Sequence, residues 1–289
     1  MKKILVFGEI LFDIFGSEKK LGGAPLNFAC HFSLLGGTPY VISAVGDDEN
    51  GRNALEEASR YGVDTSLTAV SDLETGYCRV TLSDGVPSYD LVCPVAYDVI
   101  PCPEINDGYD GFYFGTLAQR SEKSRETLSK LLEKGQKNVF FDVNIRQHYY
   151  DRERLDFSLR HTDILKVSRE EIGVFAEVGI CESRDIDGVC REICRKYPVS
   201  LVVVTLDKDG GMVYDPKTNK KYYSRAPESK VVSTVGGGDS FSAAFYLNYL
   251  NGESVETCLE RAVTLSDYVV TQLGAVCVYP DELKKRLCV

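Results

Sequence analysis

The stretch VVSTVGGGDSFSAAF, from Val231 to Phe245, is the most informative part of the chain. Three glycines, Gly236, Gly237 and Gly238, lie between a short β-branched run and a stretch that favours a helix. Glycine permits positive φ and leaves no side chain between the backbone and a ligand. Backbone amides in such a turn can converge on one anion, and the positive end of the helix dipole favours the same charge. The stretch therefore predicts an anion site at the start of a helix.

A carboxylate, Asp239, follows these glycines directly. A carboxylate repels phosphate, but it is suited to accepting a proton from a hydroxyl that attacks a phosphoryl group. The simpler interpretation is a flexible glycine turn with Asp239 as the helix N-cap, since both features are common. The more specific hypothesis is that the stretch serves phosphoryl transfer to an alcohol. Other parts of the chain must support it before it is preferred to a simple turn and cap.

Composition narrows the class of protein. The 289 residues are 44% hydrophobic and 26% charged, which is typical of a globular protein with a sizeable core. The net charge of −10 argues against nucleic-acid and membrane-surface partners, which favour a basic face. The N-terminal run MKKILVFGEILFDIFG starts like a signal peptide, but Glu9 and Asp13 interrupt it. We therefore expect a cytoplasmic protein.

The cysteines do not indicate a metal site. There are ten, without a C-x-x-C pair, and only three histidines. Cys190 and Cys194 have helical spacing but no histidine near them in sequence, so zinc is not expected. We interpret most of these cysteines as small buried residues in a reducing compartment.

Hydrophobic patterns and turn signals predict alternating strands and helices along most of the chain. This order is typical of an α/β fold with a mostly parallel sheet and helices on both faces, in which ligands bind beyond the carboxyl ends of the strands. The predicted strands cover residues 3–7, 39–45, 77–82, 88–92, 111–114, 138–143, 164–166, 201–206, 211–214 and 221–223. The predicted helices cover residues 23–35, 50–61, 121–133, 169–177, 185–195, 239–250 and 255–273.

Several polar clusters are predicted at strand ends, on the ligand side of the sheet. Gly22 and Gly23 open the first helix and let a ligand approach the backbone, and Asn27 can donate to or accept from hydroxyls. Asp13 is expected at the end of the first strand segment, where a carboxylate could bind a pair of sugar hydroxyls. The run Asp142–Arg146 ends another strand and is expected to point into the same cleft.

Three common signatures are absent from the sequence. There is no G-x-x-x-x-G-K-[ST], no G-x-G-x-x-G after the first strand and no G-x-S-x-G. A P-loop enzyme, a dinucleotide-binding Rossmann fold and a triad hydrolase are therefore not expected.

The segments GGAPLNFACHFSLLGG and STVGGGDSF resemble the two signatures of the PfkB, or ribokinase-like, carbohydrate kinases. The runs GDDENG, DVNIR, LKVSREE, VVVTLDKDG and GAVCVYP also match, so the resemblance covers essentially the whole chain. It implies a single ribokinase-like domain over residues 1–289: a three-layer α/β/α sandwich with a mostly parallel sheet. It also implies a small β lid from about residues 12–22 and 72–98.

The resemblance assigns roles to individual residues. Asp239 corresponds to the catalytic base, and the amides of Gly236, Gly237 and Gly238 to the anion hole for the transferring phosphoryl group. Glu171 matches the acid that helps to organise Mg²⁺, through water. The implied sugar contacts are Asp13, Gly22, Gly23 and Asn27, with Asn144 and Arg146 as further candidates. The implied nucleotide contacts are Ser168, Thr205, Gly210, Gly236 and Gly238.

Three positions depart from the family pattern. Ser233 replaces an Asp that helps to hold a monovalent cation in relatives, so potassium activation is in doubt. Ser168 replaces the Asn of N-x-x-E, which weakens the organisation of Mg²⁺ and phosphate. Asp207 replaces the Gly of T-L-G beside the nucleotide and alters how closely that loop approaches it.

The resemblance implies an ATP- and Mg²⁺-dependent sugar kinase, with fructose to fructose 6-phosphate as the leading reaction. The compact GEILFD entry, DVNIR and the short first lid segment resemble bacterial fructokinases. The D-x-N-x-R pattern also occurs in 2-keto-3-deoxygluconate kinases, where Arg146 would face a carboxylate. A nucleoside kinase is less favoured, because no aromatic clamp for a base is evident. A sensing protein that has lost turnover is the alternative of another class. Relatives often dimerise through the lid, so a homodimer is a further expectation.

Overall fold

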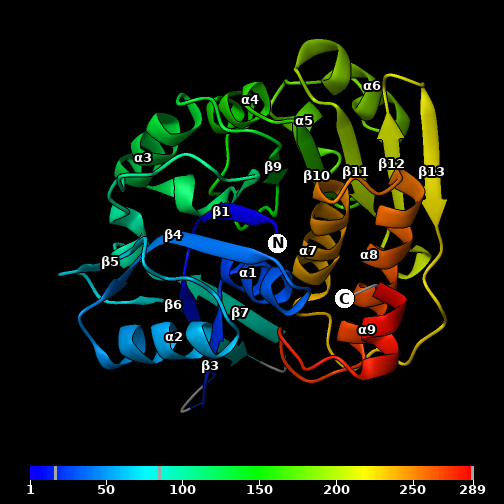
Figure 1. The fold of residues 1–289 in the computed structure, drawn as a ribbon. Helices are drawn as coiled ribbons and strands as arrows, with labels where there is room; N and C mark the ends of the chain where they lie inside the picture. The colour runs from blue at the N-terminus through cyan, green and yellow to red at the C-terminus, as the bar shows by residue number, and fades with distance from the viewer. Residues whose placement is uncertain (16–17, 84–85, 288–289) are drawn as a thin grey trace.

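The chain folds around a large sheet with helices packed on both faces (Figure 1). The computed structural model describes residues 1–15, 18–83 and 86–287. The sheet has nine strands in the order β13-β12-β11-β10-β9-β8-β1-β4-β5. All pairs from β5 to β11 are parallel, and β12 and β13 are antiparallel additions at one edge. The bounds are β1 (Lys3–Phe7), β4 (Thr38–Gly46), β5 (Thr68–Ser71), β8 (Gly111–Gly115), β9 (Val139–Asp142), β10 (Ile164–Ser168), β11 (Leu201–Thr205), β12 (Gly211–Asp215) and β13 (Lys220–Ser224).

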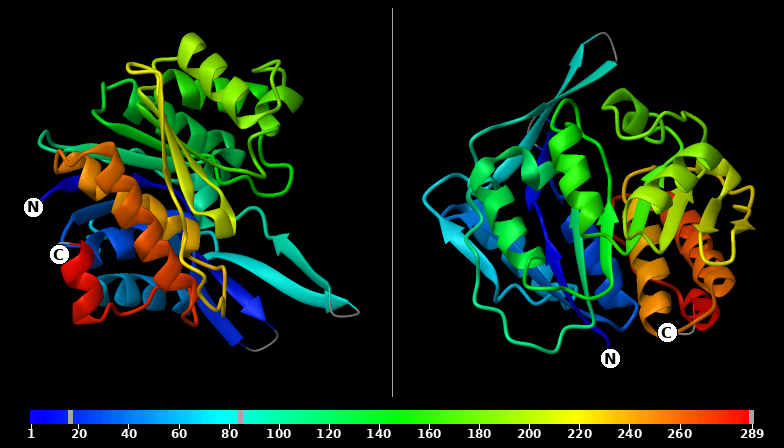
Figure 2. Two further views of the ribbon diagram at one scale, coloured as in Figure 1. Left: turned by 90° about the vertical axis from the view of Figure 1, so that its right-hand side faces the viewer. Right: turned by 90° about the horizontal axis from the view of Figure 1, so that it is seen from above.

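Helices cover both faces because the central strands bury side chains on both sides. In β1, Ile4 and Val6 pack into one core layer and Leu5 and Phe7 into the other, as alternation along a strand requires. The two helical layers lie on opposite sides of the sheet (Figure 2). One layer holds α1 (Ala24–Leu34), α2 (Glu49–Arg60), α7 (Gly237–Leu250), α8 (Val255–Val270) and α9 (Asp281–Leu287). The other holds α3 (Glu122–Leu132), α4 (Arg152–Arg160), α5 (Val174–Glu177) and α6 (Ile186–Lys196). The predicted α/β/α architecture is confirmed.

A second sheet of four strands, in the order β3-β2-β6-β7, is formed by the segments expected to make the lid. Figure 2 shows the β6–β7 hairpin projecting from the body of the molecule. The predicted turn Asp84–Gly85 of this hairpin lies outside the described residues. The bounds are β2 (Leu11–Phe15), β3 (Glu18–Gly22), β6 (Gly76–Ser83) and β7 (Val86–Leu91).

The structure corrects three sequence predictions about position. Asp13 does not end the first strand, because β1 stops at Phe7 and Asp13 lies within β2 of the second sheet. The helix predicted over residues 169–177 is confined to α5, because residues 169–173 form turns. The helix predicted over residues 239–250 begins earlier, at Gly237 with Gly236 as its cap, which also rules out the alternative of Asp239 as the N-cap.

The hydrophobic patterns did not predict β2 and β3, which only the resemblance implied as part of the lid, and three further elements were missed altogether. They are the short edge strand β5 and the helices α4 and α9. A start signal for α4 is present in the sequence: the Asp151 carboxylate accepts a hydrogen bond of 2.8 Å from the Arg154 amide. In the parts of the chain that the structure covers, no helix has both the length and the apolar character needed to span a membrane.

Candidate active site

The first turn of α7 forms a cradle of backbone amides. Gly236, its N-cap, has φ of 81°, in the left-handed region. A Cβ atom at this position would lie 2.1 Å from the Ala275 carbonyl oxygen, so both conformation and space require glycine. Gly238 and Asp239 follow in the first turn, where amides have no acceptor within the helix. This end of α7 therefore favours an anion.

The loop that packs against Gly236 is anchored from α1. His31 Nε2 donates to the Ala275 carbonyl oxygen at 2.9 Å, and His31 Nδ1 accepts from the Tyr279 hydroxyl. Burial lowers the pKa of His31 to about 4, so the imidazole is neutral, as this pattern requires. The shape of the cradle therefore depends on α1 as well as on the glycines.

Asp239 is half-buried and is held from α1. Asn27 Nδ2 donates to Asp239 Oδ2 at 2.9 Å. Burial raises the pKa of Asp239 to about 6; donation from Asn27 opposes the rise, the Asp142 charge adds to it, and Lys166 and Arg146 oppose it. A carboxyl with this pKa is ionised at neutral pH and still basic enough to accept a proton.

Beneath the cradle lies a buried pair, Asp142 on β9 and Lys166 on β10. The Lys166 Nζ atom lies 2.9 Å from Asp142 Oδ1, and both side chains are less than one-tenth exposed. Ser242 of α7 donates to Asp142 Oδ2 at 2.9 Å, and the Tyr113 hydroxyl donates to the same oxygen at 3.3 Å. Burial raises the pKa of Asp142, but its three donors favour the carboxylate, so we treat the two residues as an ion pair.

Glu9 is a second buried carboxyl at the site. It is 3% exposed, and its Oε2 atom has no hydrogen-bond partner among the described residues. Burial raises the pKa of Glu9 to about 7; the Arg146 charge lowers it and the Asp239 charge raises it. The charges of Arg146 and Asp239 thus both act on the Glu9 carboxyl.

The predicted sugar contacts converge around the entry to α1. A Cβ on Gly22 would lie 3.2 Å from Asp13 Oδ2, and a Cβ on Gly23, where φ is 102°, would lie 2.5 Å from the Glu9 carbonyl oxygen. Burial raises the pKa of Asp13, and the Arg146 charge opposes the rise. The structure thus brings Asp13, Gly22 and Gly23 together, with Arg146 close enough to act on Asp13.

Glu171 joins the ends of two strands. Its Oε1 accepts from the Ile145 amide at 2.6 Å, and its Oε2 accepts from the Ser168 amide at 2.8 Å. Asn144 precedes Ile145 in the loop that Glu171 holds, and it has φ of 39°. A carboxylate oxygen that accepts one amide keeps a lone pair for a water molecule.

The described residues contain no group of three His, Cys, Asp or Glu side chains able to hold a metal ion. Mg²⁺ usually keeps several waters and binds one or two carboxylates together with substrate phosphates. Glu171 fits a site of this kind, in which most of the ligands are phosphate oxygens and water.

The loop after β11 positions the remaining predicted nucleotide contacts. Thr205 ends β11 opposite Ser168 on β10. Gly210 has φ of 97°, and a Cβ there would lie 2.0 Å from the Ser224 carbonyl oxygen, so the fold requires this glycine whatever it binds. Asp207 adopts φ of 52°; its hydrogen bond with Glu170 and burial raise its pKa to about 6.

Exposed apolar residues lie in the chain segments next to the cradle. Val232 and Ser233 amides donate to the Val270 carbonyl oxygen at 2.8 and 3.1 Å, which places the segment before the glycines beside the end of α8. Four exposed apolar residues belong to these two segments: Val231, Val232, Val235 and Leu273. Exposed apolar surface beside an anion cradle is suited to one face of a planar base.

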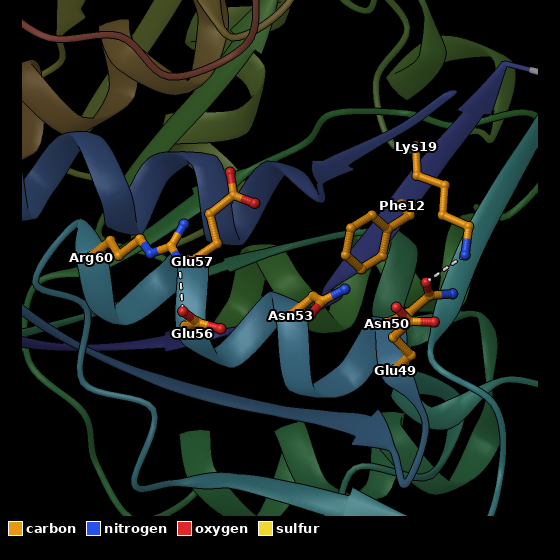
Figure 3. Close-up of a pocket in the computed structure, with 8 residues that line it drawn as sticks. All are labelled: Phe12, Lys19, Glu49, Asn50, Asn53, Glu56, Glu57 and Arg60. Carbon is orange, nitrogen blue, oxygen red and sulfur yellow. Dashed lines mark hydrogen bonds and ion pairs between the residues drawn. The ribbon is translucent and has the colours of Figure 1, made fainter. Parts of the chain in front are cut away.

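A separate hollow lies between the second sheet and α2 (Figure 3). Phe12 lines it, whereas its neighbour in β2, Asp13, points to the other face of the strand. Lys19 Nζ donates to Asn50 Oδ1 at 2.9 Å across it, and Arg60 pairs with Glu56 on α2 (Figure 3). This hollow is therefore distinct from the site at α7.

Comparison with known proteins shows which family the chain belongs to. The profile of the pfkB family carbohydrate kinases matches residues 1–281. The chain belongs to this family. Among curated relatives, the kinase is 24% identical to an ATP-dependent 6-phosphofructokinase of Thermoanaerobacterium thermosaccharolyticum, over 96% of this chain and 91% of the relative. It is 26% identical to a 5-dehydro-2-deoxygluconokinase of Halalkalibacterium halodurans, over 88% and 81% of the two chains.

Solved structures share the fold of the kinase. A sugar kinase of Pyrococcus horikoshii in complex with ATP superposes with a TM-score of 0.82 at 27% identity, covering 99% of both chains. A fructokinase of Xylella fastidiosa with bound ATP superposes with a TM-score of 0.86 at 21% identity, covering 99% of this chain and 97% of that one. The second likeness establishes the fold alone.

Sequence reasoning did not identify Glu9, Lys166 or Ser242 as parts of the site. Lys166 left a signal, because a charged residue stands within the otherwise apolar strand segment ILKV. Alternation along β10 places its side chain on the face that packs against α7. Glu9 left a similar signal, because it interrupts the apolar run VFGEILF, whereas Ser242 carries no comparable signal in the sequence.

Proposed function

We propose that this kinase transfers the γ-phosphoryl group of ATP to a primary hydroxyl of a sugar, with fructose to fructose 6-phosphate as the leading reaction. The observation that most supports the proposal is the Asn27–Asp239 hydrogen bond at the mouth of the amide cradle. It sets a base with a pKa of about 6 beside an anion site at a helix N-terminus. These are the two groups that in-line transfer to an alcohol requires.

In the proposed reaction, the sugar hydroxyl attacks the γ-phosphorus while its proton passes to the free oxygen of Asp239. Asn27 holds the other oxygen and so fixes the direction of the carboxylate. The amides of Gly236, Gly237 and Gly238 stabilise charge on the phosphoryl oxygens. Asp13, Gly22, Gly23, Asn144 and Arg146 are the proposed sugar contacts. Ser168, Thr205 and Gly210 are the proposed contacts beside the nucleotide.

Glu171 would hold Mg²⁺ through water, and the ion would offset charge on the phosphates. The Glu171 carboxylate also accepts hydrogen bonds from the Ile145 and Ser168 amides. Glu171 would therefore hold the loop that contains Asn144 in a fixed position relative to Ser168, on the nucleotide side of the site. The second sheet is the proposed lid of a single domain, which would exclude water from the reacting groups.

One observation favours a second substrate class. Arg146 is exposed, and its charge acts on Glu9, Asp13 and Asp239. A guanidinium in this place suits a carboxylate on the sugar. A sugar acid of the 2-keto-3-deoxygluconate kind is therefore the alternative to fructose, and a relative named 5-dehydro-2-deoxygluconokinase is consistent with it.

The test is sugar-dependent ADP release with Mg-ATP. The panel holds fructose, fructose 6-phosphate, ribose, glucose, 2-keto-3-deoxygluconate, 5-dehydro-2-deoxygluconate and adenosine. Asp239→Asn should reduce turnover on the active substrate by about two to four orders of magnitude, the usual size of a general-base contribution. The variant should bind ATP like the wild type, since its shape is unchanged.

Each result of this experiment bears on a different part of the proposal. Release with fructose supports the leading reaction, and release only with a sugar acid selects the alternative. ATP binding without release on any sugar would favour the sensing protein. An Asp239→Asn variant with most of its activity would remove Asp239 from the role of base.

A further inference from the structure

The proposed mechanism gives no role to Lys166, although this residue lies at the site. A buried lysine is costly unless its charge is compensated, and here the side chain is 7% exposed. Within the described residues its ammonium donates a single hydrogen bond, to Asp142 Oδ1 at 2.9 Å. An ammonium carries three donors, so two protons remain available.

The Lys166 ammonium lies next to the glycine cradle. A Cβ atom built on Gly238 would lie 3.4 Å from Lys166 Nζ, which places the charge directly against the first turn of α7. Lys166 and Asp142 are paired across β10 and β9, so the anchor and the ammonium come from adjacent strands at the edge where the loops of Asn144 and Ser168 begin. The buried pair is therefore built into the floor of the anion site.

The surrounding charges keep this lysine protonated. Burial lowers the pKa of Lys166, but attraction to Asp142, Glu171 and Asp239 outweighs burial and raises it above the usual value. The three carboxylates together outweigh the single positive charge of Lys166, so this ammonium is the group that would offset negative charge beside a bound phosphoryl group. An incoming phosphoryl group would supply an anion for the two remaining protons.

We propose that Lys166 is a catalytic cation of this kinase, whose ammonium contacts the transferring phosphoryl group from beneath the glycine cradle. This inference rests on the proposed phosphoryl transfer. In the step, a bond forms between the sugar oxygen and the γ-phosphorus, and the bond to the bridging oxygen breaks with its electron pair left on ADP. The hydroxyl proton goes to Asp239. Lys166 keeps all its protons and donates a hydrogen bond throughout.

The test compares ATP with ADP, because only ATP carries the group that Lys166 would contact. Lys166→Met alone would leave Asp142 buried without a counter-charge and risks unfolding the protein. The informative variant is therefore Lys166→Met/Asp142→Asn, which removes both charges, with Asp142→Asn as its matched control. Lys166→Arg retains a charge at the same position. Calorimetry without sugar gives the Kd values for Mg-ATP and Mg-ADP, and the active sugar of the panel gives kcat.

Relative to Asp142→Asn, the double variant should bind Mg-ATP about tenfold more weakly and turn over about 10- to 100-fold more slowly, as expected for loss of a charge-assisted hydrogen bond. Its Kd for Mg-ADP should stay within about twofold, and Lys166→Arg should recover part of the rate. Equal weakening of ATP and ADP, or an unchanged kcat, would overturn the proposal.

Failure of the proposed function gives a different result. A wild type that phosphorylates no sugar would refute the kinase reaction, whereas the comparison of ATP and ADP binding would still show whether Lys166 contacts the third phosphate. Equal Tm values for the double variant and for Asp142→Asn would exclude a difference in folding as the cause.

Discussion

At residue 239, opposing influences act on one carboxyl group. Burial and the charge of Asp142 raise its pKa, whereas Asn27, Lys166 and Arg146 lower it, and the outcome is about 6. Removal of any one of these neighbours would move the pH at which the Asp239 carboxyl ionises. The chemistry of the site thus depends on residues from α1, β9, β10 and the loop after β9, and not on the glycine run alone.

We expect the pH dependence of kcat/KM to report this carboxyl. Asp239 must be unprotonated to accept a proton, so the rate should be level above about pH 7 and fall about tenfold per unit below about pH 6. Glu9, with a pKa of about 7, is a competing source of the same acid limb. Glu9→Gln separates the two. If the limb disappears in this variant, the assignment to Asp239 is wrong.

At the scale of elements, the start of α7 is set by steric contacts with a distant loop. Gly236 and Gly252 both have φ near 80°, at opposite ends of the same helix. A Cβ on Gly236 would meet the Ala275 backbone at 2.1 Å, whereas a Cβ on Gly252 would meet nothing within 4 Å. The two glycines therefore share a conformation but not an environment.

This difference provides a matched comparison. Gly252→Ala should cost about 1–2 kcal/mol of unfolding free energy from left-handed strain alone and should leave turnover near that of the wild type. Gly236→Ala should cost more and lose most activity, because the clash with Ala275 displaces the cradle amides. Urea unfolding and steady-state kinetics measure both. Equal losses of stability with equal activity would mean that the cradle tolerates a side chain.

The predictions about elements failed where a tertiary contact replaced a local preference. Residues 169–173 favour a helix by composition, but the Glu171 carboxylate accepts the Ile145 and Ser168 amides, and this holds the segment in turns. α4 was missed because the basic and aromatic loop before it obscured the Asp151 cap. Local propensity is a weak guide when one side chain bridges two strand ends.

On the scale of the whole molecule, Arg120 connects the second sheet to the part of the chain that leads back to the main sheet. Its guanidinium donates to Asp98 at 2.7 Å and to the carbonyl oxygens of Leu91 and Val92, where β7 returns toward the main sheet. The Arg120 and Asp98 side chains are each 2% exposed. A buried pair of this kind is costly to break, because removal of one partner leaves an uncompensated charge.

Arg120→Met should therefore lower the free energy of unfolding by about 3–5 kcal/mol. Arg60→Met provides the control, since Arg60 pairs with Glu56 on the exposed face of α2 and such pairs contribute about 0.3–0.5 kcal/mol. Chemical denaturation of both variants is the measurement. Similar, small losses would show that the Arg120–Asp98 pair does not stabilise the junction.

The sequence alone determined the α/β alternation, the glycine cradle at Gly236 to Gly238 and the neighbouring carboxylate of Asp239. These features are local, because period, turn chemistry and helix starts are properties of consecutive residues. Only the tertiary structure brought Asn27 to Asp239, set the Lys166–Asp142 pair under Gly238 and packed Ala275 against Gly236. Those contacts join residues far apart in the chain, and they depend on strand order and on burial, which no short stretch of sequence contains.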